Sequence, residues 1–427
     1  MLKKILVKGP ALSRSGYGEQ TRFALRALRS REDVFDVYIL NIPWGATGHV
    51  AATTDEIRWI HEKMGHLSLY TQQTQGRPAF DISLQVTIPL EFEKIAPINI
   101  GYTAGIECTK ISPKWIEKSN GTIDKIITIS EHAKTGLTGT TYNATNQETG
   151  EQVPNWGITA PVEVVGYPVR DVTPEPLSVD FTTTKNFLAI SQWGPRKNLE
   201  NTIRWFVEEF QDDEDVGLVL KTNTANDSIL DRLRTQKRLE QLLSNTERWG
   251  VKDKKCKIYL LHGEVTEGQL AWLYQHPTMQ GLINLAHGEG FGLPLFEAAY
   301  HELPLITLTW GGQLDFICKK NKKGKQVPHV VRVDYNIGPV QPEAVWAGVI
   351  EKDAMWAFAK ESSYKRALRD TLNKQKHHRS RAAALKKELV QNFQEEALLE
   401  RFVSFLYEEP DQEVADWLKK IEEISEL

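Results

Sequence analysis

Short apolar runs and helix-like repeats alternate along the first half of the chain. Thr21, Ala24, Leu25 and Leu28 recur at the i, i+3, i+4, i+7 spacing of one helix face. An apolar run at 5–7 and a glycine-containing loop precede them. Residues 82–88 alternate apolar and polar side chains, which predicts a strand with one less buried face. Further strands are predicted at 37–40, 98–100, 126–129 and 162–165.

The same alternation restarts after residue 185. Ile203, Phe206, Val207 and Phe210 mark one helix face. Repeated strand–helix units favour parallel sheets with helices on both faces. The predicted fold class is therefore α/β, with two doubly wound, Rossmann-like domains that face each other across a cleft. Strands of the second domain are predicted at 187–190, 216–220, 257–261, 282–283 and 305–308.

A proline-rich stretch separates the two series, and helices are predicted to end the chain. Pro168, Pro174 and Pro176, with three consecutive threonines, are typical of a linker. Beyond Pro342 the pattern predicts mostly charged helices, with one or two over 385–406 and a short acidic one after Pro410. The apolar anchors Phe393, Phe402 and Phe405 need a partner surface, so we expect these helices to pack back across both domains. The predicted division is 1–168, linker 169–185, 186–385 and 386–427.

Composition narrows the class of protein. The chain has 427 residues, of which 41% are hydrophobic and 25% charged, as in soluble globular proteins with two or three domains. Its net charge of −4 does not favour a nucleic-acid coat protein. Cys108, Cys256 and Cys318 form no Cys-x-x-Cys pair, which favours reduced thiols. No apolar run approaches the ~18 residues of a membrane span, and we expect a cytoplasmic protein.

The segment 287–299, His-Gly-Glu-Gly-Phe-Gly-Leu-Pro-Leu-Phe-Glu-Ala-Ala, follows a predicted strand and opens a helix. Its three glycines allow backbone amides to approach a ligand closely, and a helix start suits phosphate. Glu289 lies in the loop. Glu297 lies eight residues later in the helix, where a carboxylate can accept hydrogen bonds from the vicinal hydroxyls of a ribose. The alternative is a glycine-rich turn with two solvated glutamates.

Two further segments place cations after predicted strands. Arg196 and Lys197 follow the strand at 187–190, where they can hold a diphosphate or simply begin a cationic helix. Lys221 directly follows the strand at 216–220 and can point into the cleft or into solvent.

Together, these segments resemble the retaining, nucleotide-sugar-dependent glycosyltransferases of the GT-B fold, in the group 1, family 4 type with a Glu-x7-Glu signature. Glu289 and Glu297 have that spacing, and segments 196–198 and 309–316 are also similar. In the first half, the glycine loop 15–19 and a pattern from Thr103 to Ser130 resemble a less common subgroup. The resemblance covers roughly residues 1–405.

The resemblance implies that the second domain holds a nucleotide sugar and the first an acceptor. Arg196 and Lys197 would neutralise the leaving diphosphate, and Glu289 would lie beside the transferred sugar. Gln192 stands where many members have an arginine. The family often has a histidine near the sugar in the acceptor domain. In this chain, Glu107 is the candidate for that acceptor-side place. The implied donor-binding residues are Gly16, Gly18, Lys221, Gly290, Phe291, Gly292 and Glu297, the last on the ribose.

The leading hypothesis is a retaining glycosyltransferase that moves a hexose or similar sugar to a hydroxyl of a glycan, lipid-linked or small-molecule acceptor. No cofactor or metal is expected, because fixed cations and a helix start can stabilise a leaving diphosphate. One alternative is a viral enzyme that glycosylates a hydroxylated base in DNA. The basic runs at 319–325 and 374–387 are suited to contact DNA phosphates. The second alternative is a non-catalytic GT-B scaffold that binds a nucleotide sugar or glycan.

Overall fold

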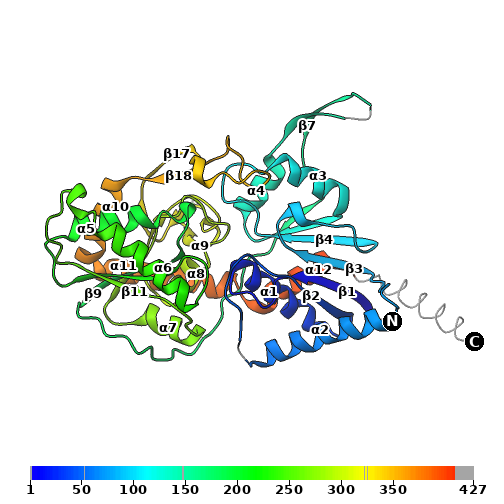
Figure 1. Cartoon of the computed structure of the whole chain (residues 1–427), viewed down its shortest axis with the longest axis horizontal. Coiled ribbons are helices and arrows are strands. Elements are labelled where there is room, and N and C mark those ends of the chain that lie inside the picture. Colours follow the sequence, from blue (N-terminus) through cyan, green and yellow to red (C-terminus); the bar gives the residue numbers. More distant parts are fainter. Residues whose placement is uncertain (1, 52, 147–148, 322, 325, 409–427) are drawn as a thin grey trace, which may run out of the picture.

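A computed structural model describes residues 2–51, 53–146, 149–321, 323–324 and 326–408 (Figure 1). The acidic helix predicted after Pro410 lies outside the described residues. Within them, no helix is long and apolar enough to cross a membrane.

The N-terminal half is built on a six-stranded parallel sheet with the order β2-β1-β3-β4-β5-β8. Its strands are β1 (Lys3–Gly9), β2 (Phe35–Asn41), β3 (Ile82–Val86), β4 (Ile98–Thr103), β5 (Lys125–Thr128) and β8 (Val162–Val164). The connecting helices are α1 (Gly16–Arg29), α2 (Asp55–Gln73), α3 (Pro113–Thr122) and α4 (Glu131–Gly139). An antiparallel hairpin, β6 (Tyr142–Thr145) and β7 (Gln152–Trp156), projects from this domain (Figure 1).

The C-terminal half has its own six-stranded parallel sheet, with the order β11-β10-β9-β12-β13-β16. Its strands are β9 (Lys185–Gln192), β10 (Val216–Asn223), β11 (Lys257–Leu261), β12 (Met279–Asn284), β13 (Leu305–Leu308) and β16 (Val331–Val333). The connecting helices are α5 (Leu199–Phe210), α6 (Ile229–Leu243), α7 (Glu267–Gln275), α8 (Leu293–Tyr300) and the short α9 (Leu314–Ile317). The predicted α/β class with two Rossmann-like sheets is thus confirmed.

The strand order of the second sheet marks where a ligand is expected. Counted within the domain, the order is the 3-2-1-4-5-6 of classic Rossmann sheets. Ligands of such sheets bind beyond the carboxyl ends of the strands at the switch point. Here the switch point lies between β9 and β12.

The prediction that β3 has a less buried face is wrong. All five of its residues are buried, because β3 lies between β1 and β4 in the middle of the sheet. The polar residues on the second face are paired: the Ser83 hydroxyl donates to Asn99 Oδ1 at 2.8 Å. The amide of Gln85 bonds both the backbone N–H and the carbonyl of Glu93, at 2.9 and 2.6 Å.

The prediction of mostly helical structure after Pro342 is wrong up to residue 359. Strand β18 (Met355–Ala359) lies in this stretch and forms an antiparallel hairpin with β17 (Tyr335–Pro339), which precedes Pro342. Trp356 of β18 is fully buried, with its ring stacked 5.1 Å from that of His287. This packing against a residue far away in the sequence stabilises the strand.

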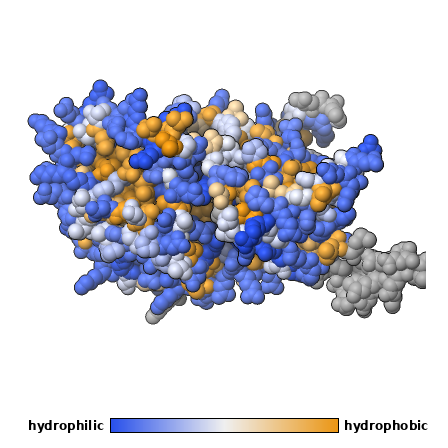
Figure 2. Space-filling model, turned by 60° about the horizontal axis from the view of Figure 1, so that its bottom comes forward, coloured by the Kyte–Doolittle hydropathy of each residue, from blue (hydrophilic) through white to orange (hydrophobic). Residues whose placement is uncertain are grey.

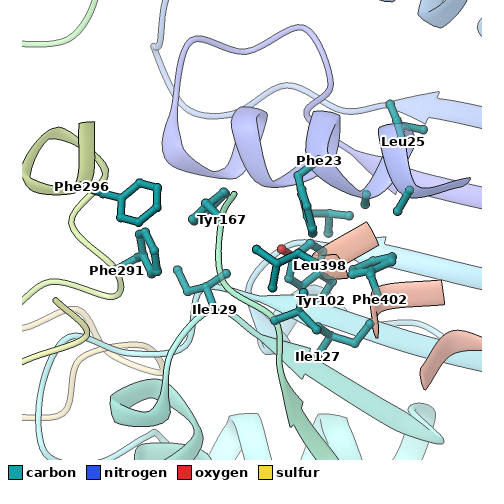
Figure 3. Close-up of a cluster of buried hydrophobic side chains, with 14 of the residues drawn as sticks. Phe23, Leu25, Tyr102, Ile127, Ile129, Tyr167, Phe291, Phe296, Leu398 and Phe402 are labelled. Carbon is teal, nitrogen blue, oxygen red and sulfur yellow. The ribbon is translucent and has the colours of Figure 1, made fainter. Parts of the chain in front are cut away.

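The C-terminal helices are α10 (Glu361–Asn373), α11 (Gln375–Asn392) and α12 (Glu395–Leu406), so the segment 385–406 contains a break at Phe393. Phe393 packs on Phe296 of α8 at 5.2 Å, in the second domain. Phe402 of α12 packs on Phe23 and Tyr102 of the first domain, at 5.7 and 5.1 Å (Figure 3). These helices therefore pack across both domains.

Candidate active site

The loop 285–292, called the carboxylate loop below because it carries Glu289, joins the end of β12 to α8. Gly292 has a φ of 92°, a left-handed conformation that suits glycine and turns the chain into α8. Gly288 is equally constrained, because a Cβ there would lie 1.9 Å from the carbonyl oxygen of Glu107. Glu289 lies between these glycines with its side chain 8% exposed, and Asn284 at the end of β12 donates to Glu289 Oε1 at 2.9 Å.

Two cations from the neighbouring loop hold this carboxylate. Lys197, in the short 3-10 helix η2 (Pro195–Lys197) after β9, donates to both oxygens of Glu289 at 2.7 and 2.8 Å. Arg196 contacts Glu289 Oε2 at 3.3 Å and donates to the Gly288 carbonyl at 2.7 Å. A backbone bond from His287 to the Arg196 carbonyl, at 2.8 Å, fixes the two loops together. The switch point is therefore occupied by a Lys–Arg–Glu cluster in which Glu289 is buried and the two cations are partly buried.

The cluster sets the charge of its members. Burial alone raises the pKa of Glu289, but Lys197 and Arg196 outweigh it and bring that pKa down to about 2. Burial and the nearby Arg196 lower the pKa of Lys197. Glu289 is therefore ionised at neutral pH.

The first domain contributes Glu107, from the loop after β4. Glu107 Oε1 lies 3.0 Å from an Arg196 nitrogen, across the junction of the two domains. Burial lowers the pKa of Arg196, but the carboxylates Glu107 and Glu289 outweigh this effect and raise it. The structure thus brings Glu107, Arg196, Lys197 and Glu289 together, as the sequence-based hypothesis requires.

The start of α4 also docks on the carboxylate loop. The hydroxyl of Ser130, the N-cap of α4, donates to the Gly290 carbonyl at 2.6 Å. The backbone N–H of Glu131 donates to Asp315 Oδ2 at 2.9 Å. The next residue, His132, follows directly at this junction.

Sequence reasoning missed His132. Its ring lies 4.9 Å from that of Trp310, edge to face, and its Nε2 is buried with no hydrogen-bond partner among the described residues. Burial lowers the pKa of His132, although Glu107 opposes this effect, so the imidazole is neutral at pH 7. The sequence feature that pointed to His132 was its position about one turn after the carboxyl end of β5. The cations Arg196 and Lys197 follow the end of β9 in the same way.

Glu297 lies in a different environment. On α8 it accepts a hydrogen bond from the Tyr274 hydroxyl at 2.8 Å, and burial raises its pKa to about 7. Sequence reasoning gave no role to Tyr274. Tyr274 binds Glu297 whereas Lys197 and Asn284 bind Glu289, so the two carboxylates of the signature occupy separate polar sites.

The remaining predicted donor-side residues are dispersed around the cluster. Gly16 is exposed at the start of α1, and Gly18 is buried where a Cβ would lie 1.9 Å from the Ser13 carbonyl oxygen. Arg14 of this glycine loop pairs with Glu264 of the second domain. Lys221 donates to the Gly263 carbonyl at 2.7 Å, and burial lowers its pKa.

Two other residues near the loop lie away from the cation cluster. Phe291 is buried, 5.0 Å from Tyr167 of the first domain, where it joins the two cores (Figure 3). Gln192 donates to the Thr224 carbonyl at 3.0 Å rather than pointing at the cations. Among the residues that the structure describes, no three His, Cys, Asp or Glu side chains gather as ligands for one metal ion.

Comparison with solved structures identifies the architecture. The chain superposes on sucrose-phosphate synthase from Thermosynechococcus elongatus with a TM-score of 0.57 and 11% identity, covering 94% of this chain and 98% of the other. It matches a glycosyltransferase from Rickettsia africae at a TM-score of 0.57 and 12% identity, over 95% and 98% of the two chains. For the Anabaena protein HepE in complex with UDP-glucose, the TM-score is 0.54 at 11% identity, over 95% and 99%. The chain has the GT-B fold.

Sequence comparison is local by contrast. No family model matches the chain. Two serotype-specific mannosyltransferases, both WbdA of Escherichia coli, are 30% identical to it over 123 residues, which is 28% of this chain. The chain spans only 13% and 12% of the length of these two proteins.

Proposed function

We propose that this protein is a retaining glycosyltransferase that moves a sugar from a nucleoside-diphosphate sugar to a hydroxyl of a glycan or lipid-linked glycan. The observation that carries the proposal is the cluster of Arg196, Lys197 and Glu289 at the switch point of the second sheet, closed by Glu107 from the first domain. The GT-B fold and the local match to mannosyltransferases support it.

In this proposal the two partly buried cations, Arg196 and Lys197, account for leaving-group departure. A nucleoside diphosphate gains negative charge on its oxygens as the glycosidic bond breaks, and fixed positive groups in a water-poor cleft stabilise that charge strongly. Lys197 and Arg196 already lie in hydrogen-bonding range of a carboxylate, so an oxyanion can take the same donors. The backbone amides of the loop 290–292 and the start of α8 add further positive potential. We propose that turnover needs no divalent metal for this reason.

The carboxylates take positioning roles in this proposal. Glu289 hydrogen-bonds the transferred sugar and does not form a covalent intermediate, while Glu297 accepts hydrogen bonds from the ribose. Gly16 and Gly18 close on the diphosphate from the first domain, and Lys221 lies on the donor side. The acceptor hydroxyl then attacks from the face that the leaving group vacates, beside Glu107, so that configuration is retained.

DNA as acceptor receives less support. The two basic runs do lie side by side, since Lys319 in β14 (Cys318–Lys320) pairs with Glu388 of α11 at 2.6 Å. Further cations of these runs also pair with carboxylates: Lys386 with Glu302 at 3.4 Å, and Lys374 with Asp370 at 2.7 Å. Such pairs reduce the charge that is free to bind phosphates.

The proposal is tested by thermal shift with UDP-, GDP- and ADP-sugars, followed by donor hydrolysis without acceptor. A true donor raises the melting temperature and releases sugar slowly. Lys197→Ala should abolish most of the release, whereas Lys257→Ala, at an exposed lysine of the same domain, should not. Stabilisation without any release, in the presence or absence of acceptor glycans, would instead favour a non-catalytic sugar-binding scaffold.

A further inference from the structure

Helix α6 presents apolar side chains to solvent. Ile229, Leu230 and Leu233 are 79%, 67% and 57% exposed. The inward face of the same turns is polar, because Asp231 and Thr235 are buried there. A helix that packs only on its own domain normally shows the opposite pattern. The outward face of α6 is therefore suited to a surface that is not part of this chain's core.

Cations flank these apolar residues on both sides. Because the helix has 3.6 residues per turn, one stripe along it contains Leu230, Arg234 and Lys237. Arg232 lies on the opposite side of the apolar pair Ile229 and Leu233. All three cations are exposed, and none has an ion pair among the residues that the structure describes. This contrasts with Lys386 of α11, which pairs with Glu302.

Isolated hydrophobic residues elsewhere do not have this setting. The face in Figure 2 is mostly hydrophilic, with hydrophobic areas over both domains, as is normal for a soluble surface. Leu69 of α2 is 58% exposed but is a single residue. On α6, three apolar side chains within five residues combine with unpaired cations, which is the composition of helices that lie on anionic membranes.

The place of α6 in the fold links this face to the cleft. Ser228 is the N-cap of α6, and the preceding loop touches the first domain. There, the Asn226 side chain donates to the Ala46 carbonyl at 3.1 Å. The first turn of α6 thus lies at the rim where the two domains meet. A bilayer that contacts this turn would lie beside the entrance to the candidate active site.

We infer that α6 binds an anionic lipid bilayer: Ile229, Leu230 and Leu233 enter the headgroup region, and Arg232, Arg234 and Lys237 bind lipid phosphates. Surface contact of this kind needs no membrane-spanning helix. The inference deepens the proposed function, since it places the enzyme at a surface that carries lipid-linked acceptors.

The test is flotation of the full chain with vesicles of phosphatidylcholine alone or with one-third phosphatidylglycerol. We expect binding to the anionic vesicles only, and release in 1 M salt, where screening extends over only ~3 Å. Replacing Arg232, Arg234 and Lys237 by Gln should weaken binding about a hundredfold, because each cation near an anionic surface contributes about fivefold. The triple change to Ser at Ile229, Leu230 and Leu233 should weaken it at least tenfold.

Leu69→Ser is the matched control and should bind vesicles like the parent. Donor-induced thermal shifts should be the same in all variants, so loss of membrane binding and failure of the proposed function are distinguishable. Absence of flotation, or flotation unaffected by both triple variants, would overturn the inference. So would a dimer in light scattering that the same variants convert to monomer, because α6 would then bind a second copy of the chain.

Discussion

Glu289→Gln should lower the free energy of unfolding by about 3 kcal/mol at pH 7. Against the effect of burial, Lys197 and Arg196 bring the pKa of this carboxyl from 4.5 to about 2. At ~1.36 kcal/mol for each pKa unit, that difference amounts to about 3 kcal/mol. The side chain is only 8% exposed, so solvent screens the interaction little. The substitution also leaves the partly buried Lys197 without its carboxylate, whereas Arg196 keeps Glu107.

The sign of the pH dependence follows from the lowered pKa. The folded state holds the proton of Glu289 less tightly than the unfolded state, so this stabilisation is fully present above about pH 4.5. It is lost as pH falls through about 2. The difference in the free energy of unfolding between the parent and Glu289→Gln should therefore narrow to about 2 kcal/mol near pH 3.5.

The assay is urea denaturation followed by tryptophan fluorescence at both pH values. Glu93→Gln is the control, since Glu93 pairs with Lys8 at 2.5 Å but is 60% exposed, and exposed pairs contribute about 0–1 kcal/mol. A loss below ~1 kcal/mol for Glu289→Gln, or an equal loss at both pH values, would show that the cluster does not hold this carboxylate as the structure indicates.

Further outcomes are expected from the proposed roles. Lys197→Ala should lower kcat by ~10²–10³, as measured by initial rates, if the lysine acts like one oxyanion-hole donor. Glu297→Gln should raise the donor KM with little change in kcat. Burial raises the pKa of Glu297 to about 7, so ionising this carboxyl as pH rises lowers the free energy of unfolding of the parent. Glu297→Gln should therefore become more stable relative to the parent between pH 5 and 8 in denaturation experiments. Excess EDTA should leave the initial rate unchanged, and rescue by Mg²⁺ of an inhibited enzyme would contradict the metal-free mechanism.

Strands with continuous apolar runs were the most predictable elements. The predicted strand at 257–261 has the bounds of β11, and the run at 216–220 lies inside β10. The run in β10 arises because helices cover both faces of the sheet, so burial specifies this element, whereas β11 is an edge strand without a buried residue. The alternating segment 82–88 was misleading for the same reason, since Ser83 and Gln85 are buried in a hydrogen-bonded network that no periodicity shows.

The hairpin β17–β18 was not predictable from local pattern. Its register pairs Tyr335 with Ala359, and its stability depends on the burial of Trp356 against His287, which lies about 70 residues earlier in the chain. The two strands carry no charged residue, but the prolines and glycines in and between them interrupt any period-2 pattern. Contacts of this kind depend on the assembled domain, which a window of a dozen residues does not contain.

Residue spacing predicted the candidate site within the second domain, whereas across the junction only the family resemblance pointed to Glu107, and His132 was missed. The sequence places Arg196, Lys197 and Glu289 after strands of one sheet, and the carboxyl ends of parallel strands share an edge, so their meeting follows from topology. Glu107 and His132 belong to the other sheet, and nothing in the spacing along the chain shows how two domains face each other. The geometry that joins them is backbone geometry: Gly288 has no Cβ where the Glu107 carbonyl lies, and Gly290 accepts from Ser130. Glycines of the signature loop thus serve the contact between the domains as well as any ligand, and a Gly288→Ala variant would separate the first domain from the cations before it altered any side chain of the site.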